Sequence, residues 1–247
     1  MRQVALLVLA VACKATDDYP VDPIHNPGMN PPGTDATVAG DVATPPIDAA
    51  DQNTITGRVC VMVDPRDQAM CAGTGAAGLT VTLATAMATT ADDGAFTIAR
   101  PTGSNLVWHV TGSTLVTSVV PYGATTVIPA MRALAYSDIA DNNGVSVQNP
   151  GEGEIFVRVV RAGAAVAHAQ ASSAPPPQYG ALYETADAVV WNLNAASGTG
   201  SHGAAWIAGA PGGLATVTIT PSGGAAVVVP NVPVEDQANT YLAVEIP

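Results

Sequence analysis

Basic residues are scarce in this sequence. Its 247 residues include 8 Lys and Arg against 20 Asp and Glu, a formal net charge of −12, and Lys14 is the only lysine. Proteins that bind nucleic acids use Lys and Arg to neutralise phosphates. The composition therefore argues against a nucleic-acid partner. The acidity also opposes direct adsorption of the protein to anionic lipid headgroups.

Aromatic side chains are scarce as well. They make up 4% of the chain, whereas hydrophobic residues make up 48%, so Ala, Val, Ile and Leu must fill most of the core. Together with 24 Gly and 20 Pro, these small and β-branched residues favour short strands and tight turns over long helices. The composition predicts an all-β protein with enough length for about two domains.

The N-terminal apolar run is too short to cross a membrane. Met1-Arg2-Gln3 supplies a positive charge, Val4–Ala12 is continuously apolar, and small residues lead to Cys13. A membrane-spanning helix needs about 20 apolar residues. The pattern instead predicts an export signal over residues 1–12, cleaved before Cys13.

The end of this segment, Ala10-Val11-Ala12-Cys13, resembles the lipobox of bacterial lipoproteins. In that family the cysteine is lipidated on its sulfur and becomes the first residue of the mature protein. The resemblance implies lipidation of Cys13, attachment to a membrane through the N-terminal lipid, and a place in the bacterial cell envelope, with the outer membrane favoured. Ala10 stands where the family usually has leucine, and the same residues fit the A-x-A rule of secretory cleavage. A soluble secreted protein therefore remains the alternative.

The lipoprotein resemblance also decides how the three cysteines are used. With Cys13 assigned to the lipid, Cys60 and Cys71 remain as a pair, and an exported protein is expected to oxidise such a pair. On the chain-entropy account, closing a loop of this length stabilises the fold by roughly 3 kcal/mol. The spacing is not C-x-x-C, so a zinc or thioredoxin-like site is disfavoured.

Residues 13–52 lack apolar periodicity and contain seven prolines among Asp, Thr, Asn and Gly. Such a segment cannot bury enough surface to fold. It is interpreted as a disordered tether between the lipid and the first folded domain.

Residues 53–128 are predicted to form a first β-sandwich. Ile55–Val63 and Leu79–Leu83 alternate between apolar and polar residues, and Asp93-Gly94 predicts a hairpin turn. Ile55-Thr-Gly57-Arg-Val59, Gly78–Leu83 and Thr90–Ile98 resemble the carboxypeptidase regulatory-like domain, a transthyretin-like β-sandwich. The resemblance implies a scaffold rather than a particular chemistry.

The pattern recurs over residues 151–247, which predicts a second sandwich. Gly153–Val159 repeats the first strand, and Gly163–Ala169, Gly203–Trp206 and Gly213–Thr220 follow in the same order. Between the two, residues 129–150 are predicted to form a helical connector, with apolar residues at helical spacing over 130–140 and a stop at 142–144. The predicted fold is therefore two tandem transthyretin-like or Ig-like β-sandwiches joined by a short helical connector.

The four histidines do not follow a metal-binding motif, since H-x-H, H-x-x-E-H and H-E-x-x-H are all absent. One enzyme class with a similar sandwich, the intradiol ring-cleaving dioxygenases, holds iron with two tyrosines and two histidines. Its close His-x-His pair is missing here, so this is the third hypothesis. The residues that would form such a set are His168, Tyr179, Tyr183 and His202.

Candidate acids, bases and nucleophiles also lack a catalytic pattern. Ser197 and Ser201 lie in glycine-rich turns without a G-x-S-x-G elbow. The paired carboxylates Asp92-Asp93 and Glu152/Glu154 suit acid–base chemistry or calcium in type, but turn chemistry explains the first pair better. We therefore expect no catalytic residue, no metal and no cofactor.

Three tryptophans are the candidate ligand contacts. Trp108, Trp191 and Trp206 lie on predicted strands, where exposed rings would stack on sugars and buried rings would fill the core. The predicted function is a non-catalytic binding or spacer module of the envelope, with an unknown protein or glycan ligand. A carbohydrate-binding module is the alternative, and an exposed row of Trp or Tyr would favour it.

Overall fold

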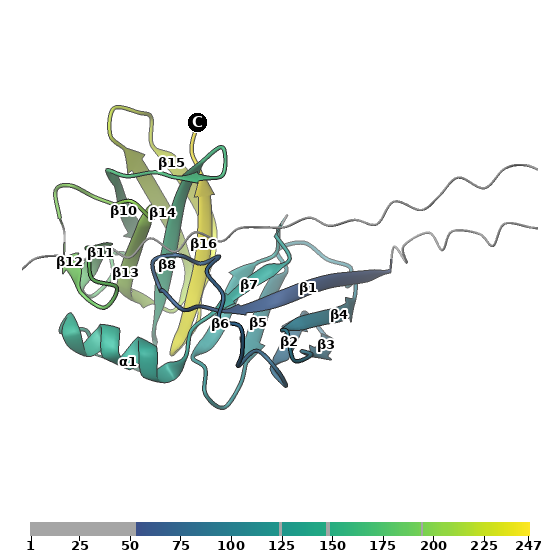
Figure 1. Cartoon of the computed structure of the whole chain (residues 1–247). Helices are drawn as coiled ribbons and strands as arrows, with labels where there is room; N and C mark the ends of the chain where they lie inside the picture. Colours follow the sequence, from purple (N-terminus) through teal and green to yellow (C-terminus); the bar gives the residue numbers. More distant parts are fainter. Residues whose placement is uncertain (1–52, 124, 147–148, 194) are drawn as a thin grey trace, which may run out of the picture. The chain divides into compact units, whose positions relative to one another are not determined.

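The computed structural model describes residues 53–247, apart from residues 124, 147–148 and 194. In this part the chain forms sixteen strands and one helix (Figure 1). The all-β prediction is confirmed. The predicted signal and the whole predicted tether, with Cys13 and His25, lie outside the described residues.

The largest sheet has ten strands. Nine of them lie in the order β12 (Trp191–Leu193), β11 (Gly180–Glu184), β13 (Ala204–Pro211), β8 (Glu152–Arg161), β16 (Ala238–Glu245), β6 (Thr117–Pro121), β5 (Val107–Thr111), β2 (Thr80–Leu83) and β3 (Ala86–Thr89). The short strand β9 (Ala164–Ala165) pairs with β8.

Two three-stranded sheets complete the β-structure. The first has the order β4 (Ala95–Ala99), β1 (Thr54–Val61), β7 (Val127–Ala130), and the second has the order β10 (Ala169–Ala174), β14 (Gly213–Pro221), β15 (Val227–Val234). The strand β1 begins at the first residues of the predicted sandwich. The strand β15 pairs with β14 antiparallel, with one register shift between Ala215 and Val217.

The two predicted sandwiches share one sheet. The last strand, β16, lies between β8 of the second half and β6 of the first half, and it is parallel to both. Figure 1 shows β16 running beside β8. Strand pairing therefore joins the two halves directly, and the described residues belong to a single unit.

Two cores lie on opposite faces of this sheet, because side chains alternate along a strand. On β8, Phe156 belongs to the first core, while Ile155 and Val157 belong to the second. On β13, Trp206 and Ile207 are divided in the same way. Strands that are buried on both faces read as continuous apolar runs, which explains why this half shows weaker alternation than β1.

The helix α1 (Ala133–Asn142) lies in the predicted connector but starts three residues later than the predicted apolar pattern. Residues 127–130 instead pair with β1 as β7. The buried face of α1 consists of Tyr136, Ile139 and Ala140, and Leu134 is 75% exposed. The helix ends where the sequence predicts, since Gly144 has a left-handed backbone with φ of +65°.

The Asp93-Gly94 turn does not close a hairpin, contrary to the prediction. Its flanking strands, β3 and β4, pair with β2 and β1 respectively, so the turn carries the chain from one sheet to the other. Asp93 Oδ1 accepts a hydrogen bond from the Ala95 amide at 2.9 Å. Gly94 has φ of +85°, and a Cβ there would lie 2.5 Å from the Val59 carbonyl oxygen, so glycine is required by both conformation and space.

Candidate functional site

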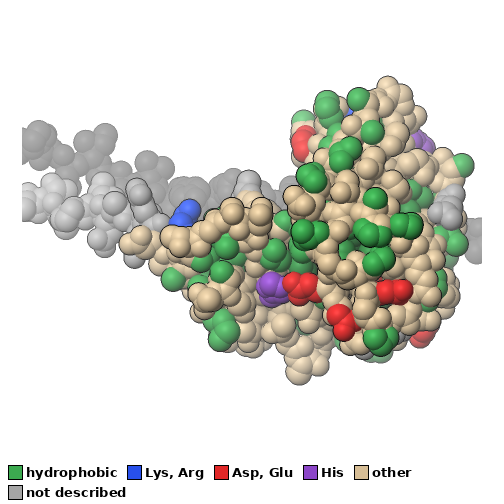
Figure 2. All heavy atoms as spheres, turned by 180° about the vertical axis from the view of Figure 1, so that it is seen from behind, with side chains coloured by type: hydrophobic (Ala, Val, Ile, Leu, Met, Phe, Trp, Pro, Cys, Tyr) green, Lys and Arg blue, Asp and Glu red, His purple; other side chains and the backbone are tan. Residues whose placement is uncertain are grey.

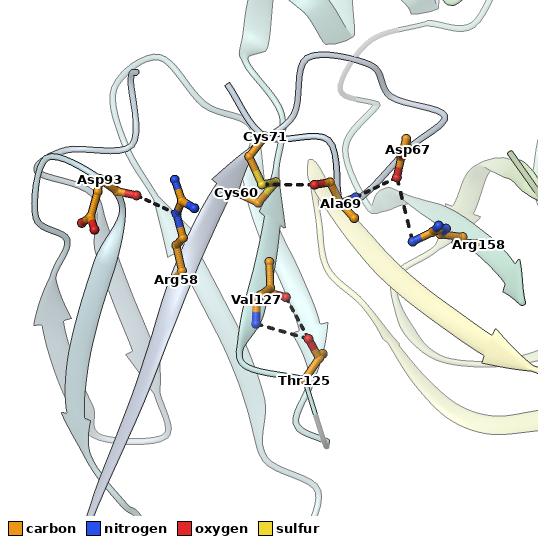
Figure 3. The surroundings of a disulfide bond; sticks show 9 residues. All are labelled: Arg58, Cys60, Asp67, Ala69, Cys71, Asp93, Thr125, Val127 and Arg158. Carbon is orange, nitrogen blue, oxygen red and sulfur yellow. Dashed lines mark hydrogen bonds and ion pairs between the residues drawn. A yellow bond between two sulfur atoms is a disulfide. The ribbon is translucent and has the colours of Figure 1, made fainter. Parts of the chain in front are cut away.

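The disulfide between Cys60 and Cys71 is present, with an S–S distance of 2.05 Å (Figure 3). It links the end of β1 to the turn-rich insert of residues 62–77, and Met62 pairs with Cys71 as an isolated β-bridge. The bridge and the disulfide therefore close residues 62–71 of the insert into a loop at the end of β1. Its tip is free to reach other parts of the chain.

We expect a free-thiol assay on denatured, unreduced protein to find no reactive thiol from Cys60 or Cys71. Reduction should then release two thiols, because the only other cysteine is Cys13. A Cys13→Ser variant serves as the control that removes any contribution from that residue. Two thiols in the unreduced variant would contradict the disulfide.

The insert docks onto the second half of the protein. Arg66 Nη1 donates hydrogen bonds to the carbonyl oxygens of Thr185 and Ala186, both at 2.9 Å. Gln68 Nε2 donates to the Phe156 carbonyl oxygen on β8 at 3.1 Å. These three bonds hold the disulfide-closed insert against the strands of the other half.

Arg66 is held in place by an ion pair with Asp64 at 2.6 Å. Burial alone would raise the pKa of the Asp64 carboxyl, but the hydrogen bonds and positive charge of Arg66 keep that pKa below its ordinary value. The pair is largely shielded from solvent, with side-chain exposures of 11% and 16%. The ion pair with Asp64 orients the Arg66 guanidinium toward the carbonyl oxygens of Thr185 and Ala186.

A cavity of about 500 Å³ opens beside this insert. Its walls come from the insert, β1, β6 and β7 of the first half, and β8 and β16 of the second. Much of its surface is apolar, formed by Val120, Val127, Pro129, Tyr241 and Ala243. A concave, mostly apolar space of this size is typical of small-molecule sites.

Two arginines, Arg58 on β1 and Arg158 on β8, also line the cavity. Figure 3 shows them on opposite sides of the disulfide. Arg58 Nε donates to the Asp93 carbonyl oxygen at 2.8 Å. Arg158 Nη1 lies 3.9 Å from Asp67 Oδ1, beyond hydrogen-bonding distance. The cavity therefore combines apolar walls with two cationic groups, one from each half.

Sequence reasoning missed both arginines, because neither belongs to a motif. The one indication in the sequence is that basic residues are rare, which makes each arginine worth locating in the fold. Residues 53–247 contain no lysine and only six arginines. Figure 2 shows a face with hydrophobic and acidic side chains and only isolated basic ones. Two of these six arginines line the same cavity, and only the tertiary structure shows that they lie together.

The three tryptophans do not form a stacking platform. Trp108 and Trp206 are fully buried and Trp191 is 4% exposed. The chain has few aromatic side chains, and all three tryptophans lie in the core. Among the described aromatic residues only Tyr122 falls in the exposed class, at 37%. A flat row of rings for sugar stacking is therefore absent from the described part of the protein.

The proposed dioxygenase set does not converge. Tyr183 is buried in the second core, and its hydroxyl accepts from the Ala171 amide at 2.8 Å. Tyr179 packs against the first core, on the other face of the sheet. Residues on opposite faces cannot share one iron. The described residues also contain no cluster of three or more His, Cys, Asp or Glu that could hold a metal.

Ser201, His202 and Glu184 lie together but in the wrong arrangement for a catalytic triad. His202 Nδ1 is 2.6 Å from Glu184 Oε2 and 3.5 Å from Ser201 Oγ. In a triad the acid and the serine contact different ring nitrogens. Glu184, with a side chain 2% exposed, also accepts from the amides of His202 and Ala204. This carboxylate orders the turn before β13.

Glu154 is the second buried carboxylate. Its oxygens accept from Trp206 Nε1 at 2.6 Å, Tyr136 Oη at 3.0 Å and the Gly209 amide at 3.2 Å. Burial raises the pKa of Glu154 to about 7, against the opposing effect of these donors. The cavity next to it holds about 10 Å³, room for about one water molecule. The sequence identified Glu154 only as half of a carboxylate pair.

No protein-family model matches this chain, and no curated protein matches it. Among solved structures, it is similar to the Bacillus anthracis TIE protein at 12% identity and a TM-score of 0.22, over 78% of this chain and 34% of that chain. It is also similar to a group B streptococcus pilus 2b backbone protein at 14% identity and a TM-score of 0.23, over 78% and 90% of the two chains. With TM-scores this low, neither likeness carries an argument about function.

Proposed function

We propose that this protein is a non-catalytic binding module of the bacterial cell envelope, attached to a membrane through lipid on Cys13. The observation that supports binding is the cavity beside the disulfide. It is walled by both halves, and its lining combines two arginines with a mostly apolar surface, which suits the binding of a ligand. Its size lies within the range of small-molecule sites.

Two features support the location. Met1–Cys13 has the charge, apolar run and small residues of an export signal. The Cys60–Cys71 disulfide is of a kind that persists in oxidising compartments such as the periplasm or cell surface. No helix among the described residues is long and apolar enough to cross a membrane.

We expect Cys13→Ser to move the protein from the membrane fraction to the soluble fraction. Stable attachment needs two or more acyl chains, and Cys13 is the residue that would receive them. Cell fractionation with immunoblotting measures the shift, and Thr16→Ala serves as a control that should stay with the membrane.

A mass spectrum of the N-terminal peptide completes this test. Wild-type protein that is soluble and begins with an unmodified Cys13 would contradict the lipid anchor. That outcome would support the secreted alternative instead. Neither outcome affects the disulfide or the cavity, because both lie in the folded part of the chain.

A further inference from the structure

We infer that the cavity beside the disulfide binds an organic anion, namely a carboxylate carried on an apolar body. The inference rests on the proposal that the chain is a binding module, and it adds the chemical class of the ligand. It follows from the unfilled bonding capacity of two arginines and from the apolar surface between them.

Arg158 has hydrogen-bonding capacity that the protein does not use. Its Nε atom is buried and has no hydrogen-bond partner among the described residues. Asp67, the nearest carboxylate, uses the same Oδ1 atom to accept from the Ala69 amide at 3.0 Å, and it stays 3.9 Å from Arg158 Nη1. Among the described residues the Nη groups of Arg158 donate no hydrogen bond, so they are available to a carboxylate bound in the cavity that this residue lines.

Arg58 is the second cation of the cavity. Its Nε atom donates to the Asp93 carbonyl oxygen, which orients the side chain without neutralising it. Among the described residues Arg58 has no ion pair, and no hydrogen bond from its Nη groups is present. The fork of a guanidinium matches the two oxygens of a carboxylate, so Arg58 is available to an anionic ligand.

The surface between the two arginines is apolar. Val120, Val127 and Pro129 come from the first half, and Tyr241 and Ala243 come from β16. Burying an apolar group there would stabilise the complex in proportion to the apolar area removed from water. A small inorganic anion would leave this surface unused, so the lining favours a ligand with a hydrocarbon part.

The charge of the cavity differs from that of the rest of the protein. The chain carries a net charge of −12, which repels anions at long range. Four other surface cavities in the described part contain neither Arg nor Lys in their lining. Among these five cavities, the one beside the disulfide alone offers an anion a cationic partner.

Calorimetric titration of the full chain with its disulfide intact tests this inference. The Cys13→Ser form is used so that lipid does not interfere. Octanoate should bind at one site, and 1-octanol, which has a similar chain without the charge, should bind at least roughly tenfold more weakly. A second pair, acetyl-Leu-Val-Leu with a free or an amidated C-terminus, tests whether a peptide carboxylate is bound as well.

Arginine variants locate the site. Arg158→Gln and Arg58→Gln should each weaken octanoate binding by roughly fivefold or more. Arg161→Gln is the matched control, because Arg161 lies on β8 outside the cavity lining and its Nε donates to the Pro247 carbonyl oxygen. It should bind as the wild type does. If Arg158→Gln fails to fold, Arg58→Gln, at an exposed position, still decides the test.

Each outcome is informative about the ligand. Binding of octanoate alone, or of the free peptide alone, supports the carboxylate site and identifies its source. Equal binding of octanol and octanoate, equal effects of all three arginine variants, or no binding at all would overturn the inference. These results are independent of the fractionation test, which concerns only the anchor.

Discussion

Replacing Trp206 by alanine should lower the free energy of unfolding by about 4 kcal/mol or more. The side chain is fully buried on β13, and its ring stacks on Phe156 with centroids 5.5 Å apart. It also contacts Trp191 and Tyr136 edge-on. Removing such a ring leaves a large cavity in the core, which by itself costs about 3–5 kcal/mol.

A second cost comes from Glu154. Trp206 Nε1 is the nearest donor to this carboxylate, at 2.6 Å, and its loss leaves a buried oxygen with only the more distant Gly209 amide. Urea unfolding followed by circular dichroism measures the total effect. Leu214→Ala, at a position 65% exposed, should change stability little. A loss below about 2 kcal/mol for Trp206→Ala would contradict the packing described here.

Replacing Glu154 by glutamine should stabilise the protein at pH 8 by about 3 kcal/mol and leave it nearly unchanged at pH 4. The pKa of Glu154 rises from the ordinary 4.5 to about 7 in the folded state, mainly because of burial. Each pKa unit corresponds to about 1.4 kcal/mol. Because the folded-state pKa is raised, the contribution to stability is complete below pH 4.5 and is lost as the pH rises through 7.

Glutamine removes this pH dependence without removing the hydrogen bonds. Its carbonyl oxygen accepts from Trp206 Nε1 and the Gly209 amide, and its NH₂ group donates to the Tyr136 hydroxyl. The measurement is the difference in unfolding free energy between variant and wild type from pH 4 to pH 8. Taking this difference cancels other carboxyls, including Asp64, whose lowered pKa acts in the opposite direction.

Leu214→Ala, at a position 65% exposed, is the control. It removes no titratable group, so its difference from wild type should stay constant over the same interval. A flat difference for Glu154→Gln would mean that the pKa of Glu154 is the same in the folded and unfolded states. The burial described for this carboxylate would then be wrong.

Local sequence patterns predicted most of the strands. Period-two alternation marked β1 and β2, and the recurrence of the first half's pattern marked β14. Residues that favour turns also predicted where elements end. Gly144, for example, lies at the predicted end of the helix α1. The pairing of strands was not predictable in the same way. Asp93-Gly94 has the sequence of a hairpin turn, yet it connects two sheets.

The prediction of strand pairing failed because pairing depends on contacts between residues that are distant in the sequence. The strand β7 looked like the start of the connector helix, and its parallel pairing with β1 overrides that local preference. The position of β16 between β8 and β6 likewise joins distant residues, since Asn239 pairs with Glu154, 85 positions away, and Ala238 pairs with Thr117, 121 positions away. A pattern of neighbouring residues in the sequence cannot indicate which distant strand will pair with them.

The sequence by itself determined the all-β class, the pair Cys60 and Cys71, and the acidic character that argues against a nucleic-acid partner. The fold class and the charge follow from composition and local periodicity, which are present in the sequence before any folding. The cysteine pair follows from the export signal and from the lipoprotein resemblance that assigns Cys13 to lipid. Only the tertiary structure decided that the tryptophans fill the core, that Glu154 is buried, and that Arg58 and Arg158 line one cavity. Burial and convergence depend on which strands become neighbours, and that is decided by packing of the whole chain.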